Sequence, residues 1–158
     1  MGITLRNRFA LVALAAMASL LPAADAGAEP TARQAMRPGL YCLANAWGTP
    51  DVASRPCDIN DAGQRWTVSG NQISLTDAPG YCLANAWGTP DVSTKPCDPN
   101  DEGQYWDVTG QQISLNYDPA YCLANAWGTP DVASRPCDTN DAGQHWVVFK
   151  DQISLALV

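Results

Sequence analysis

The sequence has little positive charge and almost no histidine. It contains 9 Lys and Arg residues against 16 Asp and Glu residues, a single histidine, and a formal net charge of −7. An acidic chain whose few basic residues are scattered repels phosphate backbones, so nucleic acids and anionic membrane surfaces are poor partners. With one histidine and no Cys-x-x-Cys pair, a zinc site is a weak expectation. We expect no metal and no cofactor.

Apolar runs long enough to span a membrane are also missing. The longest, residues 9–24, has 16 residues, short of the roughly 20 that a spanning helix needs. Two arginines precede this run and the small residues 26–28 follow it, which is the order of a secretory signal peptide. We therefore expect a signal peptide at residues 1–28, a flexible leader at 29–37, and a secreted protein that is either extracellular or periplasmic.

What the sequence does contain is a unit of 40 residues written three times. The copies begin at Tyr41, Tyr81 and Tyr121, and residues 41–75 differ from residues 121–155 at only six positions. A repeated unit of this kind buries its apolar face only against its neighbours. We expect one domain over residues 38–158, with repeats at 38–77, 78–117 and 118–158.

Each unit is predicted to form four short strands and no helix. In the first copy, residues 40–44 and 52–57 are short strand-like runs, and a turn-rich segment lies between them. Residues 66–68 and 73–75 alternate apolar with polar around a hairpin turn. Because Trp66 and Val68 repeat unchanged while position 67 varies, we expect positions 66 and 68 in the core and position 67 in solvent.

Three units of four strands can close in two ways. A propeller has a similar period but usually roughly four to eight blades, so three copies would need a second chain. A β-trefoil closes within one chain, around a pseudo-threefold axis. Both arrangements remove exposed sheet edges. The sequence therefore predicts an all-β fold and favours the β-trefoil.

The six cysteines recur with the unit. An even number of cysteines in an exported chain indicates a disulfide framework. Each pair has fourteen residues between its members, so pairing within each repeat is the simplest arrangement. A loop of this size adds on the order of 3 kcal/mol of stability. The expected bridges are Cys42 with Cys57, Cys82 with Cys97, and Cys122 with Cys137.

Each unit also carries a Gln-x-Trp motif seven residues after its second cysteine. Tyr-Cys-Leu opens the unit, Gly-Thr-Pro precedes the second strand and Ile-Ser-Leu closes it. Over residues 40–158 this pattern resembles the ricin B-type lectin family. The resemblance implies a β-trefoil, non-covalent carbohydrate binding with up to one shallow pocket per repeat, and a structural role for the motif tryptophan. The motif residues are Gln64, Trp66, Gln104, Trp106, Gln144 and Trp146.

The chain departs from the binding residues that the resemblance implies. In that family the pocket typically uses an Asp two residues after the first cysteine, an aromatic residue two before the second cysteine, and an Asn just ahead of the motif Gln. All three copies hold Ala, a basic residue and Gly there, so we do not expect the usual galactose site. These residues are Ala44, Ala84, Ala124, Arg55, Lys95, Arg135, Gly63, Gly103 and Gly143.

The best remaining candidate is the loop at residues 45–51 with its copies at 85–91 and 125–131. A sugar site needs an aromatic face for the C–H patch of the ring, and fixed amide and carboxylate groups for the hydroxyls. The same side chains could instead cover the end of the core and shape the turn. The candidate residues are Asn45, Trp47, Asp51, Asn85, Trp87, Asp91, Asn125, Trp127 and Asp131.

Other chemistry has weaker support. Asp58, Asn60 and Asp61 suggest calcium, but their spacing is not that of an EF-hand and these are ordinary turn residues. His145 occurs in one copy only, and nothing places two carboxylates across a cleft for hydrolysis. We expect a non-catalytic lectin-like module that binds glycans through up to three equivalent weak sites. The alternative is a protein-binding trefoil, such as a toxin-complex subunit or an inhibitor, which the loss of the family's Asp at Ala44 favours.

Overall fold

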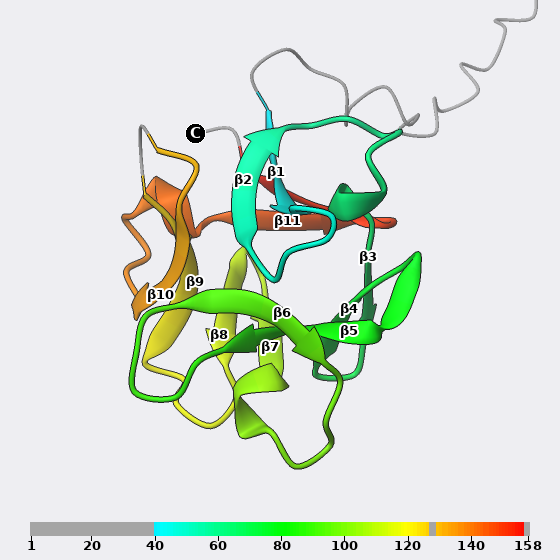
Figure 1. Ribbon diagram of the computed structural model, residues 1–158. Helices are drawn as coiled ribbons and strands as arrows, with labels where there is room; N and C mark the ends of the chain where they lie inside the picture. Colours follow the sequence, from blue (N-terminus) through cyan, green and yellow to red (C-terminus); the bar gives the residue numbers. More distant parts are fainter. Residues whose placement is uncertain (1–39, 127–128, 157–158) are drawn as a thin grey trace, which may run out of the picture.

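The computed structural model describes residues 40–126 and 129–156, which form short antiparallel strands joined by turns (Figure 1). The predicted signal peptide and leader lie outside these residues, so both stay predictions. No helix of the described part is long and apolar enough to span a membrane. The strands are β1 (Tyr41–Asn45), β2 (Val52–Pro56), β3 (Trp66–Ser69), β4 (Gln72–Leu75), β5 (Ala78–Asn85), β6 (Val92–Pro96), β7 (Trp106–Thr109), β8 (Gln112–Leu115), β9 (Tyr121–Asn125), β10 (Val132–Pro136), β11 (Trp146–Phe149) and β12 (Gln152–Leu155).

The strands form three four-stranded sheets, and each sheet crosses a repeat boundary. Their orders are β3-β4-β5-β6, β7-β8-β9-β10 and β11-β12-β1-β2. Each sheet thus joins the last two strands of one repeat to the first two of the next, and β12 pairs with β1 to close the ring. This closed arrangement of three equivalent units is the β-trefoil that the sequence predicts. One chain completes it without the second chain that a propeller would need.

The core consists of the same side chains contributed three times. Each repeat supplies a leucine from its first strand, a valine from its second, a tryptophan from its third, and an isoleucine and a leucine from its fourth. All of them are at most 8% exposed. They are Leu43, Val52, Trp66, Ile73, Leu75, Leu83, Val92, Trp106, Ile113, Leu115, Leu123, Val132, Trp146, Ile153 and Leu155.

The Gln-x-Trp motif links the strands of its repeat, as expected. The Trp66 indole Nε1–H donates to the Leu43 carbonyl at 2.9 Å, deep in the core. The buried Gln64 side chain accepts from the Asp58 amide and donates to the Pro56 carbonyl. Both sets of bonds recur in the other two repeats. The motif is therefore structural in every copy.

The disulfides pair within each repeat, which confirms the prediction. The bridges join Cys42 to Cys57, Cys82 to Cys97 and Cys122 to Cys137, with Cα–Cα distances of 4.9–5.0 Å. Each one ties the first strand of its repeat to the residue that follows the second strand.

One detail of the predicted core is confirmed only in part, since Val68 and Val148 pack against the core but are only partly buried. Position 67 faces solvent, as expected, but Val68 is only half-buried and Val108 is 39% exposed. These hairpins end one residue pair farther on, at Ser69 with Gln72 and at Thr109 with Gln112. The second apolar position therefore lies at the rim of the core, close to the hairpin tip.

Candidate functional site

The loop between β1 and β2 presents a tryptophan at its tip. The Ala46 amide donates to the Asp51 carbonyl and the Thr49 amide donates to the Ala46 carbonyl, which closes a tight turn. Gly48 has a φ of 84°, a left-handed conformation that glycine adopts without steric cost. The turn leaves the Trp47 side chain 54% exposed, and its counterpart Trp87 is 57% exposed. An exposed tryptophan on a well-braced loop is unusual, since most of this side chain is apolar.

The loop asparagine holds the loop in place and fixes it to the next repeat. Asn45 is 4% exposed. Its Nδ2 group donates to the carbonyls of Thr49 and Asp51, and to Thr94 Oγ1 in the second repeat at 2.9 Å. Asn85 and Asn125 make the same three kinds of contact, the latter reaching across to Ser54. The Nδ2 hydrogens of these side chains are thus used in hydrogen bonds within the protein, and Oδ1 is the atom left to accept a hydrogen bond from another partner.

The predicted carboxylates make their structural contacts through the main chain. Asp51 is exposed, and its main chain carries the contacts: its carbonyl accepts from Asn45, and its backbone pairs with Ser93 of the next repeat. Asp91 and Asp131 are exposed likewise and pair with Ala133 and Ala53. These three Asp residues are not part of the lining of the two pockets described below.

A pocket of about 460 Å³ lies where the first repeat meets the second. It is mostly apolar, and none of its lining side chains is charged. One wall is the tryptophan loop and the other is the start of the second repeat. The lining residues are Asn45, Trp47, Gly48, Thr49, Pro50, Leu75, Ala78, Tyr81, Thr94 and Pro96.

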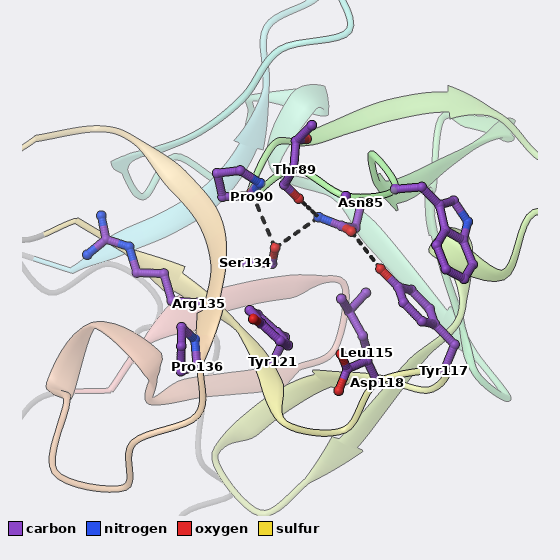
Figure 2. A pocket seen from close by; sticks show the side chains of 12 residues that line it. Asn85, Thr89, Pro90, Leu115, Tyr117, Asp118, Tyr121, Ser134, Arg135 and Pro136 are labelled. Atoms are coloured by element: carbon purple, nitrogen blue, oxygen red, sulfur yellow. Dashed lines mark hydrogen bonds between the residues drawn. The ribbon is translucent and has the colours of Figure 1, made fainter.

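A matching pocket of about 590 Å³ lies where the second repeat meets the third (Figure 2). It has the same tryptophan loop and the same tyrosine, here Tyr121, on its opposite side. Three lining side chains have no counterpart of their kind in the first pocket, namely Tyr117, Asp118 and Arg135. The third repeat junction involves Trp127, which lies outside the described residues.

Tyr117 is the residue that sequence reasoning missed. Its ring stacks on Trp87, with the ring centroids 4.2 Å apart and the planes 22° from parallel. Its hydroxyl donates to Asn85 Oδ1 at 2.8 Å, as Figure 2 shows. Burial, and then the nearby carboxylates of Asp118 and Asp101, raise the pKa of Tyr117 above its ordinary value. The repeat pattern gives no signal for this residue, because its counterpart in the first repeat is Asp77.

Two of the three positions of the family's usual binding residues leave no room for a polar side chain, while the third places Arg135 in the lining of the second junction pocket. Ala44, Ala84 and Ala124 are completely buried, at 0% exposure. A side chain at Gly63 would begin with a Cβ 2.3 Å from the Asn45 carbonyl oxygen, and at Gly103 the distance would be 2.4 Å. The region where the resemblance would place sugar-binding groups is therefore filled by the backbone of the repeat itself.

The Asp-rich turns serve the local backbone. Asp58 Oδ1 accepts from the Asn60 amide, and Asp61 Oδ1 accepts from the Gly63 amide at the start of the short 3₁₀ helix Ala62–Gln64. Within the ranges that the structure describes, no group of three or more His, Cys, Asp or Glu residues is placed to hold a metal ion. These carboxylates act in turn formation and helix capping.

Comparison with known proteins identifies related sequences and folds. The family model for the ricin-type beta-trefoil lectin domain matches residues 33–146. No curated protein sequence matches significantly.

Solved structures show the same fold at low sequence identity. A non-toxic homologue of type II RIPs from bitter gourd, in complex with α-methyl-D-galactoside, has a TM-score of 0.60 and 17% identity, over 70% of this chain and 47% of that one. GalNAc-T7 with UDP, GalNAc and Mn²⁺ has a TM-score of 0.60 and 19% identity, over 70% of this chain and 20% of that one. The C-terminal domain of an earthworm lectin, as a mutant with 6′-sialyllactose, has a TM-score of 0.54 and 16% identity, over 73% and 97%. The chain thus spans about half of the first protein and a fifth of the second.

Proposed function

Because the chain belongs to the ricin-type β-trefoil lectin domain family, we propose that it is a non-catalytic carbohydrate-binding module whose sites are the pockets at the repeat junctions. The family assignment supports the ligand class. The location of the sites is our inference from this chain, since the residues of the family's usual pocket are missing.

One observation carries the location: an exposed tryptophan stands over a pocket at each of the two described junctions. Trp47 and Trp87 offer a flat apolar face of the kind on which the C–H patch of a sugar ring packs. Hydroxyl, amide and carbonyl groups of the same loop and of the next repeat lie beside it, where they can orient a ligand. A rigid scaffold with a braced loop also reduces the ordering cost of binding.

The structural neighbours include complexes with sugars. The bitter gourd protein is in complex with α-methyl-D-galactoside and the earthworm domain with 6′-sialyllactose. At 16–17% identity these likenesses carry the fold only.

The setting that we propose is a secreted one with several weak sites. The three disulfides suit an oxidising compartment, whether extracellular or periplasmic, and agree with a signal peptide at residues 1–28. Shallow pockets bind single sugars weakly. If more than one junction binds, attachment to a dense glycan surface would gain avidity by roughly a hundredfold or more without any new contact.

A glycan array tests the ligand class and a tryptophan variant tests the location. The mature protein is expected to bind at least one glycan, and the triple variant Trp47→Ala, Trp87→Ala, Trp127→Ala is expected to lose that binding while it stays folded. Tyr105→Ala is the matched control, because it removes an aromatic side chain that lines neither pocket. Full binding by the triple variant would disprove the location.

The second candidate function is recognition of a protein. It is favoured by the missing polar residues at positions 44 and 63, which in the family's usual site would contact sugar. A protein-binding trefoil would keep the fold with no glycan site. Silence of the mature protein across a broad array of neutral and acidic glycans would favour this candidate over the first.

A further inference from the structure

Of the three lining side chains that distinguish the two described junction pockets, Tyr117 is the one that contacts the tryptophan and the asparagine of the loop. Both have the tryptophan loop, the loop asparagine and a tyrosine from the following repeat. The segment that leads into that repeat carries Tyr117 at the second junction and Asp77 at the first. Asp77 forms an ion pair with Arg65 and does not line the first pocket, whereas Tyr117 lines the second.

Tyr117 sits in its pocket in the way that a small ring-shaped ligand would. A flat six-membered ring lies on the indole of Trp87, and one hydroxyl group donates to Asn85 Oδ1 at 2.8 Å. Stacking plus one directed hydrogen bond is the minimal recognition of a sugar ring by an aromatic and an amide side chain. The chain thus displays an internal occupant that engages the loop tryptophan and the loop asparagine together.

The first junction has the same two groups without the occupant. Among the residues that the structure describes, no aromatic ring stacks on Trp47, and no donor lies within hydrogen-bond distance of Asn45 Oδ1. The Asn45 amide hydrogens are held by the loop and by Thr94, as they are at Asn85 with Ser134, so the carbonyl oxygen has the same fixed orientation. Trp47 and Trp87 are about equally exposed. The two junctions differ because Tyr117 already contacts Trp87 and Asn85 Oδ1 at the second junction.

We infer that the two junctions are not equivalent: the pocket between the first and second repeats is the open sugar site, and Tyr117 occupies the corresponding place at the second junction. This inference rests on the proposed function and adds to it which pocket binds and how. A sugar ring stacks on Trp47 and one of its hydroxyls donates to Asn45 Oδ1. Because no charged side chain lines this pocket, its ligand is a neutral saccharide.

The larger volume of the second pocket does not change this assignment. Its about 590 Å³ extends past Tyr117 toward Tyr121 and Arg135, while the Asn85 acceptor and one face of Trp87 are already engaged. A ligand that used the Asn85 acceptor and this face of Trp87 would have to displace Tyr117 and break the hydrogen bond that Tyr117 makes.

Nuclear magnetic resonance of tryptophan side chains distinguishes the two pockets directly. The mature protein is labelled with ¹⁵N-tryptophan, and the indole Nε1–H signals are assigned by single Trp→Phe variants. The neutral probes are α-methyl-D-galactoside, N-acetylgalactosamine, N-acetylglucosamine and α-methyl-D-mannoside, and the acidic probe is 6′-sialyllactose. At least one neutral probe is expected to shift the Trp47 signal in a saturable way and to leave the Trp87 signal unchanged.

Exchanging the differing residue between the junctions provides a matched pair of variants. In Tyr117→Asp the Trp87 signal is expected to gain a saturable response to the same probe. In Asp77→Tyr the Trp47 signal is expected to lose its response. The indole signals of Trp66, Trp106 and Trp146, which are buried and hydrogen-bonded, report whether each variant is folded.

The outcomes separate this inference from the proposed function. If the Trp87 signal of the wild-type protein responds to a probe, the inference is overturned. It is also overturned if no probe shifts either the Trp47 or the Trp87 signal, even when the glycan array shows binding. A folded Tyr117→Asp variant whose Trp87 signal stays silent also overturns it. If no glycan on the array binds and no indole signal shifts with any probe, the proposed function is overturned as well.

Discussion

At the scale of single residues, two glycines without a side chain allow a close backbone contact within the first and second repeats. Gly63 is buried in the short 3₁₀ helix that precedes β3, and it lies directly against the backbone of Asn45 at the end of β1. Gly103 occupies the same place in the second repeat. The close approach also brings the helix up to the asparagine that braces the tryptophan loop, so this glycine supports both the fold and the pocket.

We predict that Gly63→Ala lowers the free energy of unfolding by about 1–3 kcal/mol, the usual cost of forcing extra volume into a packed site. The new Cβ would lie 2.3 Å from the Asn45 carbonyl oxygen, a backbone atom that has no flexible end to move. Urea unfolding monitored by tryptophan fluorescence measures the change.

Gly80→Ala is the matched control, because a Cβ at Gly80 meets nothing within 4 Å and the residue does not have a positive φ. This variant is expected to be neutral or stabilised by up to about 1 kcal/mol through the reduced entropy of the unfolded chain. Equal unfolding midpoints for the two variants would contradict the steric explanation.

Tyr117 should contribute a component of stability that the protein loses at high pH. Burial and two carboxylates raise the pKa of Tyr117 above 10.0, so the folded chain holds the phenol proton more tightly than the unfolded chain does. The resulting stabilisation is fully present below about pH 10, and it is lost as the pH rises through the folded pKa.

We predict that the Tyr117 phenol ionises at a higher pH in the folded protein than in the urea-unfolded protein. Subtracting the ultraviolet titration of a Tyr117→Phe variant from that of the wild type isolates this one ionisation. An ionisation at or below pH 10 would show that the phenol is not buried beside the carboxylates of Asp118 and Asp101 as the structure describes.

At the scale of elements, the motif tryptophan couples the third strand of its repeat to the first. Trp66 begins β3, and its indole donates to the carbonyl of Leu43 in the middle of β1 at 2.9 Å. The two strands belong to different sheets, so this bond holds together parts that no strand pairing connects. Because β1 leads into the tryptophan loop, the bond also fixes the base of that loop.

We predict that Trp66→Phe costs about 1–3 kcal/mol of stability through the unsatisfied Leu43 carbonyl, in addition to the cost of the lost volume. Trp106→Phe and Trp146→Phe should cost similar amounts, because their bonds of 3.0 and 2.8 Å are equivalent. Thermal unfolding followed by circular dichroism measures the three variants. Thr67→Ser, at the exposed neighbouring position, is expected to stay within about 0.5 kcal/mol of the wild type.

At the scale of the whole molecule, the repeats depend on one another. The Thr94 amide donates to the Pro50 carbonyl at 2.7 Å, and the equivalent bonds from Ser134 to Pro90 and from Ser54 to Pro130 complete a ring around the molecule. A second ring connects the hairpins, where the amide of Trp106 donates to the carbonyl of Asn71. Through these two rings every repeat donates backbone bonds across one of its boundaries and accepts them across the other.

We predict that the isolated second repeat, residues 78–117, does not fold. It would lose the sheet partners β4 and β9 and expose its share of the common core, and its disulfide alone cannot replace that burial. A ¹H–¹⁵N correlation spectrum with poor dispersion is the expected result, against a well-dispersed spectrum for the three-repeat protein. A well-dispersed spectrum of the oxidised monomeric fragment would contradict the interdependence of the repeats.

The sequence by itself determined the features that local patterns control. Alternation of apolar and polar residues predicted the strands, since successive side chains of a strand point to opposite faces. Equal spacing predicted the disulfide pairing, because both cysteines of a pair belong to one repeat. The Gln-x-Trp motifs indicated the family and the structural role of Trp66 and its counterparts, and the recurring loop pointed to Trp47 and Trp87, which the structure places on the pockets.

Only the tertiary structure decided how the repeats meet. The pockets lie between repeats, so their second walls come from residues about 30 to 50 positions away in the chain, and no local pattern gives that pairing. Closure turned Asn45 inward as a brace, left Asp51 outside the pocket and brought Tyr117 onto Trp87. The sequence repeats nearly unchanged, but the segments that join the repeats do not, and these joining segments determine which junction is open.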